Sequence, residues 1–225
     1  MNSKKAAADK AISFIQNDMH VGLGTGSTAY WAIDGIGRRV REEGLKIKAI
    51  ATSNRSEEQA RGLGIPIFSF ADIDMLDITI DGADEVDQNM NLIKGGGGAL
   101  LREKIVASNS RQLVIIVDEN KMVRHLGKFW LPVETAVFGW EKTLKKLAAL
   151  DCTPHLRMNN DAPYVTDNGN YIVDCDFREI IQPEILHEQI NSIVGVMENG
   201  LFIKMATKVV VGHENGDAEI FNGNR

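Results

Sequence analysis

The chain has 225 residues, of which 44% are hydrophobic and 25% charged, and its net charge is −6. A chain of this length can bury most of the apolar surface of its unfolded form, and the composition excludes a disordered or fibrous protein. The acidic balance, with no run of Lys or Arg longer than two, disfavours nucleic acid as the main partner, because binding to a phosphate backbone needs a basic surface.

The first half of the chain alternates short β-rich runs with helical patterns, which is typical of βαβ units and a parallel sheet. Pro66 favours an edge position for its strand, since proline rarely lies centrally in a sheet. In chain order we predict helices over residues 6–16, 29–43, 56–63 and 99–108, and strands over residues 19–23, 47–51, 65–68, 76–81 and 113–117.

The pattern changes beyond Lys121. An extended segment at 129–137 and a helix over 140–150 are followed by Asn168-Gly169, a strong hairpin signal between 164–166 and 171–173. A helix over 183–192 and a strand near 200–203 close this region, and 208–212 can rejoin the first sheet. We therefore expect an α/β fold with a mostly parallel Rossmann-like main domain, residues 1–128 and 206–225, and a smaller inserted α+β domain, residues 129–205.

No stretch approaches the ~20 apolar residues that span a bilayer, and residues 1–16 lack the apolar core of a secretory signal. We expect a cytoplasmic protein without a membrane partner. Cys152 and Cys175 are too far apart for a Cys-x-x-Cys site, and the five histidines lack the spacing that zinc sites use. The sequence therefore predicts no metal site.

Polar motifs follow four of the predicted strands. Ligands of open α/β sheets bind outside the carboxyl ends of the strands, so we expect these motifs to meet at one site. They are Gly22 to Thr28, Thr52 to Asn54, Asp81 to Asp84 and Asp118 to Lys121.

The glycine-rich loop of the first motif opens a helix, so its backbone N–H groups and the helix dipole can cradle an anion such as phosphate. The alternative is a tight turn in which Ser27 or Thr28 caps the helix. The loop lacks the Gly-Lys-Ser/Thr ending of a nucleotide P-loop, and no acidic residue ends the second strand, which disfavours dinucleotides.

Asp81 and Asp84 bracket two small residues in a turn, where a ligand hydroxyl can reach both carboxylates. We prefer hydroxyl recognition, and the alternative is an Asx turn in which they bond backbone groups. Glu85 and Asp87 follow, but the alternate ligand positions of a calcium loop are absent.

Lys94 begins a run that continues with four glycines. Four consecutive glycines weaken any regular element, so something must approach that backbone closely. Glu103 falls in the first turns of the following helix, where it can face a cleft; the alternative is a solvent-facing residue that interacts favourably with the helix dipole.

Taken together, these motifs resemble type A ribose-5-phosphate isomerase over nearly the whole chain. The resemblance is carried by Gly24-Thr25-Gly26-Ser27-Thr28, Asp81-Gly82-Ala83-Asp84-Glu85, Lys94-Gly95-Gly96-Gly97, Arg102-Glu103-Lys104, Gly127-Lys128-Phe129 and Leu131-Pro132-Val133-Glu134. Residues 165–170 and 195–202 are similar to that family's small domain. The chain departs from the family's pattern at two places, Gly98, where relatives often have alanine, and residues 52–56.

The resemblance implies interconversion of D-ribose 5-phosphate and D-ribulose 5-phosphate through an enediolate, with no cofactor or metal, by a homodimer or homotetramer. It assigns proton transfer to Glu103, charge stabilisation to Lys94, and hydroxyl binding and ring opening to Asp81 and Asp84. The implied substrate-binding residues are Thr25, Gly26, Ser27, Thr28, Asp81, Gly82, Ala83, Asp84, Lys94, Gly95, Gly96, Gly97 and Lys121, and Lys4 matches an N-terminal lysine near the phosphate.

On this interpretation partial burial brings the pKa of Glu103 toward the working pH, as proton transfer requires. One rival function is a sugar-phosphate sensor, which would keep the phosphate loop but need neither Glu103 nor Lys94. Such a sensor normally carries a DNA-binding helix-turn-helix, for which this acidic chain has no spare segment. A second rival, a coenzyme A transferase-like enzyme, would need a carboxylate nucleophile that forms a covalent adduct.

Overall fold

The computed structural model describes residues 3–223. These residues divide into two compact units, residues 3–83, 102–121 and 205–223 in unit 1 and residues 84–101 and 122–204 in unit 2. From the sequence we expected the boundary between the two domains after residue 128. Residues 84–101 join unit 2 instead, because β4 (Glu85–Val86) and β5 (Leu92–Ile93) form a small sheet with β13 (Leu201–Phe202).

Unit 1 is built on a six-stranded sheet of order β15-β14-β6-β3-β1-β2. All neighbouring pairs are parallel except β14 and β15, which form an antiparallel pair at one edge. The strands are β1 (His20–Leu23), β2 (Lys48–Ala51), β3 (Ile78–Asp81), β6 (Leu113–Asp118), β14 (Lys208–Gly212) and β15 (Ala218–Asn222). The structure thus confirms the predicted α/β fold with a mostly parallel main sheet.

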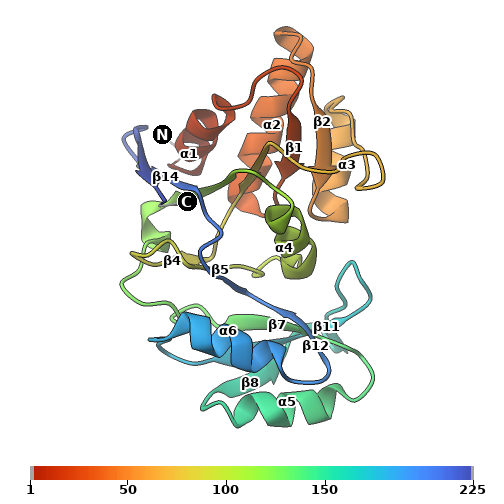
Figure 1. Ribbon diagram of the computed structural model, residues 1–225, viewed down its shortest axis with the longest axis vertical. Helices are drawn as coiled ribbons and strands as arrows, with labels where there is room; N and C mark the ends of the chain where they lie inside the picture. The colour runs from red at the N-terminus through yellow and green to blue at the C-terminus, as the bar shows by residue number, and fades with distance from the viewer. Residues whose placement is uncertain (1–2, 224–225) are drawn as a thin grey trace. The chain divides into compact units, whose positions relative to one another are not determined.

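Helices cover both faces of this sheet. Ile78 and Ile80 point into a core shared with α1 (Ser3–Ile12), α2 (Ser27–Glu42) and α3 (Asn54–Gly62), and Figure 1 shows α1 and α2 side by side. Thr79 lies between those two isoleucines, and its hydroxyl forms a 2.7 Å hydrogen bond with the hydroxyl of Ser110, just beyond α4 (Leu100–Ser108). Because successive strand residues point to opposite faces, the apolar run of β3 is buried on both sides.

Unit 2 has a four-stranded antiparallel sheet of order β12-β7-β11-β8. Its strands are β7 (Leu131–Thr135), β8 (Thr153–Leu156), β11 (Tyr171–Asp176) and β12 (Val196–Asn199), and β9 (Met158–Asn159) pairs with β10 (Ala162–Pro163). Leu147 of α5 (Trp140–Ala148) and Ile190 of α6 (Pro183–Asn191) share one core with Val133 and Val173 of the sheet. Figure 1 shows both helices along this sheet.

Two predicted strands are shorter than expected. Residues 65–68 meet β2 at one bridge, between Ala49 and Ile67, because the nitrogen of Pro66 has no hydrogen to donate to a ladder. Gly169 forms the predicted turn at φ 78°, but Val165 reaches Tyr171 through one bridge only. Strand β11 pairs with β7 and β8 instead. Within residues 3–223, no helix is long and apolar enough to cross a membrane.

Candidate active site

The glycine-rich loop runs from the end of β1 to the start of α2. Gly26 precedes the helix with φ 107° and ψ 178°, a conformation that glycine alone adopts readily, and no side chain caps the helix there. Ser27 is exposed at the first helical position. The alternative in which Ser27 or Thr28 caps the helix is therefore wrong, and the first N–H groups of α2 remain available to an anion.

Short hydroxyl side chains hold this loop against the end of β2. The Thr25 hydroxyl lies 2.7 Å from the Thr52 hydroxyl and 2.8 Å from the Ser53 hydroxyl. Ser56 donates to the carbonyl of Gly24 at 2.8 Å, and Ser53 caps α3 by accepting from the N–H of Ser56. The stretch 52–56, which departs from the family's pattern in sequence, thus supports the loop.

Asp81 ends β3 beside the same loop, and its side chain is 1% exposed. Its Oδ1 accepts from the backbone N–H of Thr25 at 3.0 Å and from that of Gly82 at 2.8 Å. Asp81 thus bonds backbone groups and fixes the loop, although neither bond goes to the residue two positions on, as in an Asx turn. A Cβ atom on Gly24 would lie 2.5 Å from the Asp81 Cα, so glycine is required there.

Lys4 of α1 donates to the Ser27 hydroxyl at 2.9 Å. The two residues are 23 positions apart in the chain, and the approach of α1 to the start of α2 brings them together. An ammonium group beside free helix N–H groups raises the positive potential where an anion would bind. The N-terminal lysine singled out in the sequence lies next to the loop.

Glu103 lies in the first turn of α4 and is 4% exposed, so it is not the solvent-facing residue of the alternative interpretation. Its neighbour Arg102 donates to the side chain of Asn54 at 2.8 Å and so ties α4 to the start of α3. Lys121 is half-buried in η1 (Glu119–Lys121), directly after β6. Four motifs of unit 1 therefore follow β1, β2, β3 and β6, whose carboxyl ends lie together because the strands are parallel.

The remaining predicted residues, Asp84 and Lys94 to Gly97, belong to unit 2. Lys94 follows β5 and is 2% exposed; its N–H donates to the carbonyl of Gly200 at 2.9 Å, and its ammonium lies 5.5 Å from the centre of the Phe202 ring. A cation over an aromatic face is stabilised by the ring quadrupole. This buried lysine is thus placed by both its backbone and its side chain.

The glycine run after Lys94 is a turn with two glycines in left-handed conformations. Gly95 has φ 105° and Gly98 has φ 81°, and the N–H of Gly98 donates to the carbonyl of Gly95 at 3.0 Å. The N–H of Gly96 donates to the Asp84 carboxylate at 2.8 Å. A Cβ atom on Gly96 would lie 2.6 Å from that carboxylate, which explains the close approach that the glycines predict.

The other acidic residues of this region also bond backbone groups. Glu85 accepts from the N–H groups of Gly127 and Phe129 at 2.8 and 2.7 Å. Asp87 accepts from the N–H groups of Asn89 and Asn91, both at 2.8 Å. No group of three metal-binding side chains occurs within residues 3–223.

The family model described as "Ribose 5-phosphate isomerase A (phosphoriboisomerase A)" matches residues 48–216. Ribose-5-phosphate isomerase A of Bacillus mycoides is 51% identical over 97% of this chain and 99% of its own length, and that of Bifidobacterium adolescentis is 50% identical over 99% and 96%. The chain belongs to the ribose 5-phosphate isomerase A family. The resemblance seen in the motifs is therefore confirmed.

Solved structures agree with this assignment. The ribose 5-phosphate isomerase of Plasmodium falciparum superposes with a TM-score of 0.95 at 40% identity, covering 99% of this chain and 98% of its own. A D-ribose-5-phosphate isomerase in complex with phospho-erythronic acid gives a TM-score of 0.95 at 38% identity over 99% and 100%. The Rossmann-like main domain with a smaller α+β domain is thus the fold of this family.

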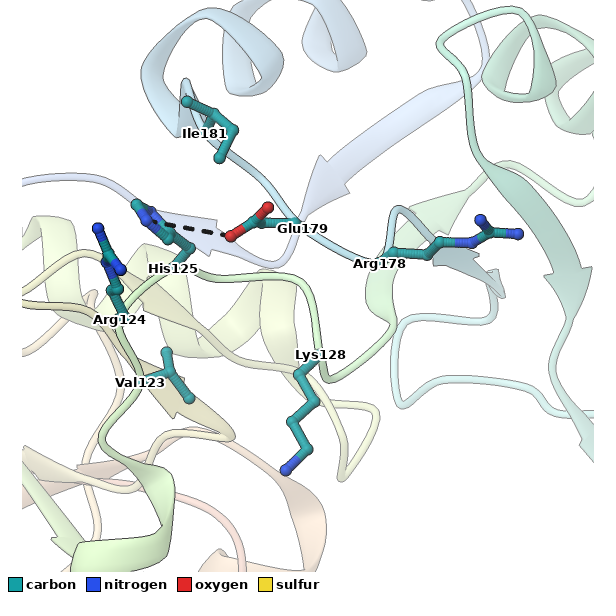
Figure 2. A pocket seen from close by; sticks show the side chains of 7 residues that line it. All are labelled: Val123, Arg124, His125, Lys128, Arg178, Glu179 and Ile181. Atoms are coloured by element: carbon teal, nitrogen blue, oxygen red, sulfur yellow. Dashed lines mark ion pairs between the residues drawn. The ribbon is translucent and has the colours of Figure 1, made fainter.

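A pocket of about 750 Å³ opens in unit 2, and its lining includes Lys128 of the Gly127-Lys128-Phe129 motif. Figure 2 shows its lining side chains, with His125 and Glu179 facing each other at 4.0 Å while Lys128 and Arg178 extend in different directions. Neither Asp84 nor residues 94–97 line it. Its size fits a small molecule, but none of the predicted catalytic or substrate-binding residues lines it.

Sequence reasoning missed two side chains that hold the Gly95 to Gly97 backbone. Arg157 donates to the carbonyls of Gly95 and Gly96, and the Tyr164 hydroxyl approaches the carbonyl of Gly97 at 3.4 Å. Each is a single polar residue more than fifty positions from the glycines, so no local spacing connects them. The only sequence signal was the glycine run itself, which indicated a close approach but not its partner.

Proposed function

We propose that this chain interconverts D-ribose 5-phosphate and D-ribulose 5-phosphate. The observation that carries the proposal is membership of the ribose 5-phosphate isomerase A family over nearly the full chain, together with the match of its motifs residue by residue. The similar isomerase that binds phospho-erythronic acid adds to it, because a phosphorylated acid with a planar carboxylate imitates an enediolate. The substrate class is therefore a pentose 5-phosphate.

Glu103 is the base of this reaction. In the open-chain aldose its carboxylate takes the proton from C2, the electron pair forms the C1–C2 double bond, and the C1 carbonyl becomes the oxyanion of an enediolate. The O2 proton then leaves, O1 is protonated, and Glu103 returns its proton to C1 to give the ketose. Low exposure of a carboxylate favours proton transfer near neutral pH by limiting its solvation.

Lys94 stabilises the enediolate charge as a fixed cation, in the manner of an oxyanion site. Its burial supports this role, since a charge in a dry environment acts more strongly than one in water. Asp84 assists ring opening and binds a sugar hydroxyl together with the Gly95 to Gly97 backbone. Asp81 shapes the loop and shares in hydroxyl binding.

The phosphate binds at the start of α2, to the residues from Thr25 to Thr28 and to Lys4. The geometry of the loop supports this role, since Gly26 leaves helix N–H groups uncapped and Lys4 adds a cation. Lys121 contributes a second cation from the end of β6. Gly82 and Ala83 keep the intervening turn small enough for a sugar to approach.

The active protein is a homodimer or homotetramer in the cytoplasm, and it needs neither a metal nor a nicotinamide. Light scattering after gel filtration gives the assembly directly, and a monomer with full activity would overturn that part. Chelated, cofactor-stripped protein should keep its activity. Activity that vanished on chelation and returned with one divalent ion would refute the metal-free reaction.

The decisive experiment is a direct assay of pentose-phosphate interconversion. Purified protein should convert ribose 5-phosphate to a ketopentose phosphate and exchange the C2 proton with solvent deuterium, because a proton held on a carboxylate exchanges before its return. A sugar-phosphate sensor would bind the substrate without turnover. A coenzyme A transferase would need an acyl donor, so inactivity on the sugar alone would favour either rival.

A further inference from the structure

We infer that Arg157 is a positioning residue of the isomerase, which fixes the peptide groups of the Gly95 to Gly97 loop through an ion pair with Asp174. The inference rests on the proposed function of that loop in substrate binding. All of the contacts that carry it lie within unit 2. Arg157 follows β8, and Asp174 lies on the neighbouring strand β11.

The guanidinium of Arg157 uses all three of its nitrogens. Its Nε bonds Asp174 Oδ2 at 2.8 Å and its Nη2 bonds Asp174 Oδ1 at 2.5 Å, which is the two-pronged pairing that matches a guanidinium to a carboxylate. The remaining nitrogen, Nη1, donates to the carbonyl of Gly95 at 3.0 Å and to that of Gly96 at 3.2 Å. Asp174 therefore sets the direction in which Nη1 points.

Holding a carbonyl also aims the N–H group on the other side of the same peptide. A trans peptide is planar, with its C=O and N–H groups directed oppositely. Because the Gly95 carbonyl accepts a hydrogen bond from Arg157, the Gly96 N–H of the same peptide points toward the Asp84 carboxylate and donates to it at 2.8 Å. In the next peptide, the Gly96 carbonyl accepts from Arg157, so the Gly97 N–H points away from Arg157. Within residues 3–223 no acceptor bonds that N–H group.

Tyr164 completes the hold on the loop. Its hydroxyl approaches the Gly97 carbonyl at 3.4 Å, and the Arg157 guanidinium lies 5.8 Å from the centre of its ring. Burial raises the pKa of the Tyr164 hydroxyl, so it keeps its proton and remains a donor at neutral pH. Arg157 and Asp174 are mostly buried as well, with side chains 16% and 17% exposed.

This arrangement solves a problem that the glycines create. Glycine has the largest conformational freedom of any residue, so a run of four would leave its N–H groups without a fixed direction. Hydrogen-bond donors orient a substrate for reaction effectively only when they themselves have a fixed direction. Arg157 fixes the direction of these peptides by bonding their carbonyl groups, and it leaves the N–H side of the loop open for a sugar oxygen.

The test compares Arg157→Ala and Arg157→Lys with Arg124→Ala, an exposed arginine of the same unit that makes no contact with the loop. We expect kcat on ribose 5-phosphate to fall on the order of 10–10² fold in Arg157→Ala, with a smaller change in KM, because a sugar hydroxyl held by misdirected donors leaves C1 and C2 poorly placed for proton transfer. Arg157→Lys should recover little, since an ammonium cannot form both pairs. Arg124→Ala should match the wild type.

Chemical rescue separates positioning from folding. Guanidinium ion at a sub-denaturing concentration should restore part of the kcat of Arg157→Ala, and sodium chloride of equal ionic strength should not. Unchanged kcat in a folded Arg157→Ala variant would overturn the inference, and so would an equal loss in Arg124→Ala. If Arg157→Ala does not fold, Arg157→Lys gives the same comparison. A wild-type protein without isomerase activity would instead refute the proposed function.

Discussion

The two loops that we propose to contact the substrate are held by different kinds of side chain. The loop after β1 is fixed by short groups at neighbouring strand ends, the hydroxyls of Thr52, Ser53 and Ser56 and the carboxylate of Asp81. The loop after β5 is fixed by two long side chains, Arg157 directly after β8 and Tyr164 directly after β10. A parallel sheet brings the carboxyl ends of its strands together, so short groups suffice there, whereas the loop after β5 is held by residues that follow strands of other sheets, and longer side chains make those contacts.

The largest effect is expected from a substitution that removes the proton-transfer group and leaves both loops unchanged. Glu103→Gln keeps the size of the side chain but cannot accept a proton, so kcat should fall by ~10²–10⁴, the usual contribution of a general base. KM should change little. Steady-state kinetics on ribose 5-phosphate measure both, and a variant that kept near-normal turnover would remove Glu103 from the mechanism.

The second prediction isolates the loop after β1. Replacing Ser27 and Thr28 together with alanine should lower kcat/KM for ribose 5-phosphate by roughly 10–10² fold, because two donors to the phosphate are lost. Free ribose, which has no phosphate, should be affected much less. Equal losses on the two sugars would mean that this loop serves folding or the sugar hydroxyls.

The third prediction compares the carboxylates that bond the two loops. Asp81→Ala removes the acceptor of two N–H groups at a site that is 1% exposed, so it should lower the free energy of unfolding by about 2–4 kcal/mol. Asp84 is half-exposed and accepts one such bond from the exposed Gly96, so Asp84→Ala should cost less than about 1.5 kcal/mol. Urea unfolding curves give both values, and equal costs would contradict the contrast.

The same contrast explains what the sequence could predict. The alternation of strands and helices places residues 22–28, 52–54 and 81–84 after parallel strands, so their meeting at one edge follows from the fold class alone. The hydrogen bond from Arg157 to Gly95 joins residues that follow β8 and β5, two strands of different sheets, and no local pattern encodes that approach. For the same reason Tyr171 to Val173, expected in a hairpin with 164–166, pair with β7 and β8 instead. Long-range antiparallel pairing is decided by packing, not by spacing along the chain.

The last comparison, which includes the smallest expected effect, concerns two glycines that both have open space around them. A Cβ atom on Gly26 or on Gly62 would meet nothing within 4 Å, so neither substitution creates a clash. They differ in backbone: Gly26 has φ 107°, whereas Gly62 is the last residue of α3 and has helical geometry. Gly26→Ala should therefore cost about 1–3 kcal/mol of stability through backbone strain. Gly62→Ala should add about 0.5 kcal/mol, because alanine restricts the unfolded chain and favours the helix.

Thermal unfolding of the two variants against the wild type measures this difference, with opposite signs expected. Gly26→Ala should also weaken phosphate binding, since relief of the strain would turn the first N–H groups of α2 away from their present direction, while Gly62→Ala should leave the kinetics unchanged. A Gly26→Ala protein as stable and as active as the wild type would show that the left-handed backbone before α2 is dispensable. The anchoring of this loop would then rest on its hydroxyl and carboxylate partners alone.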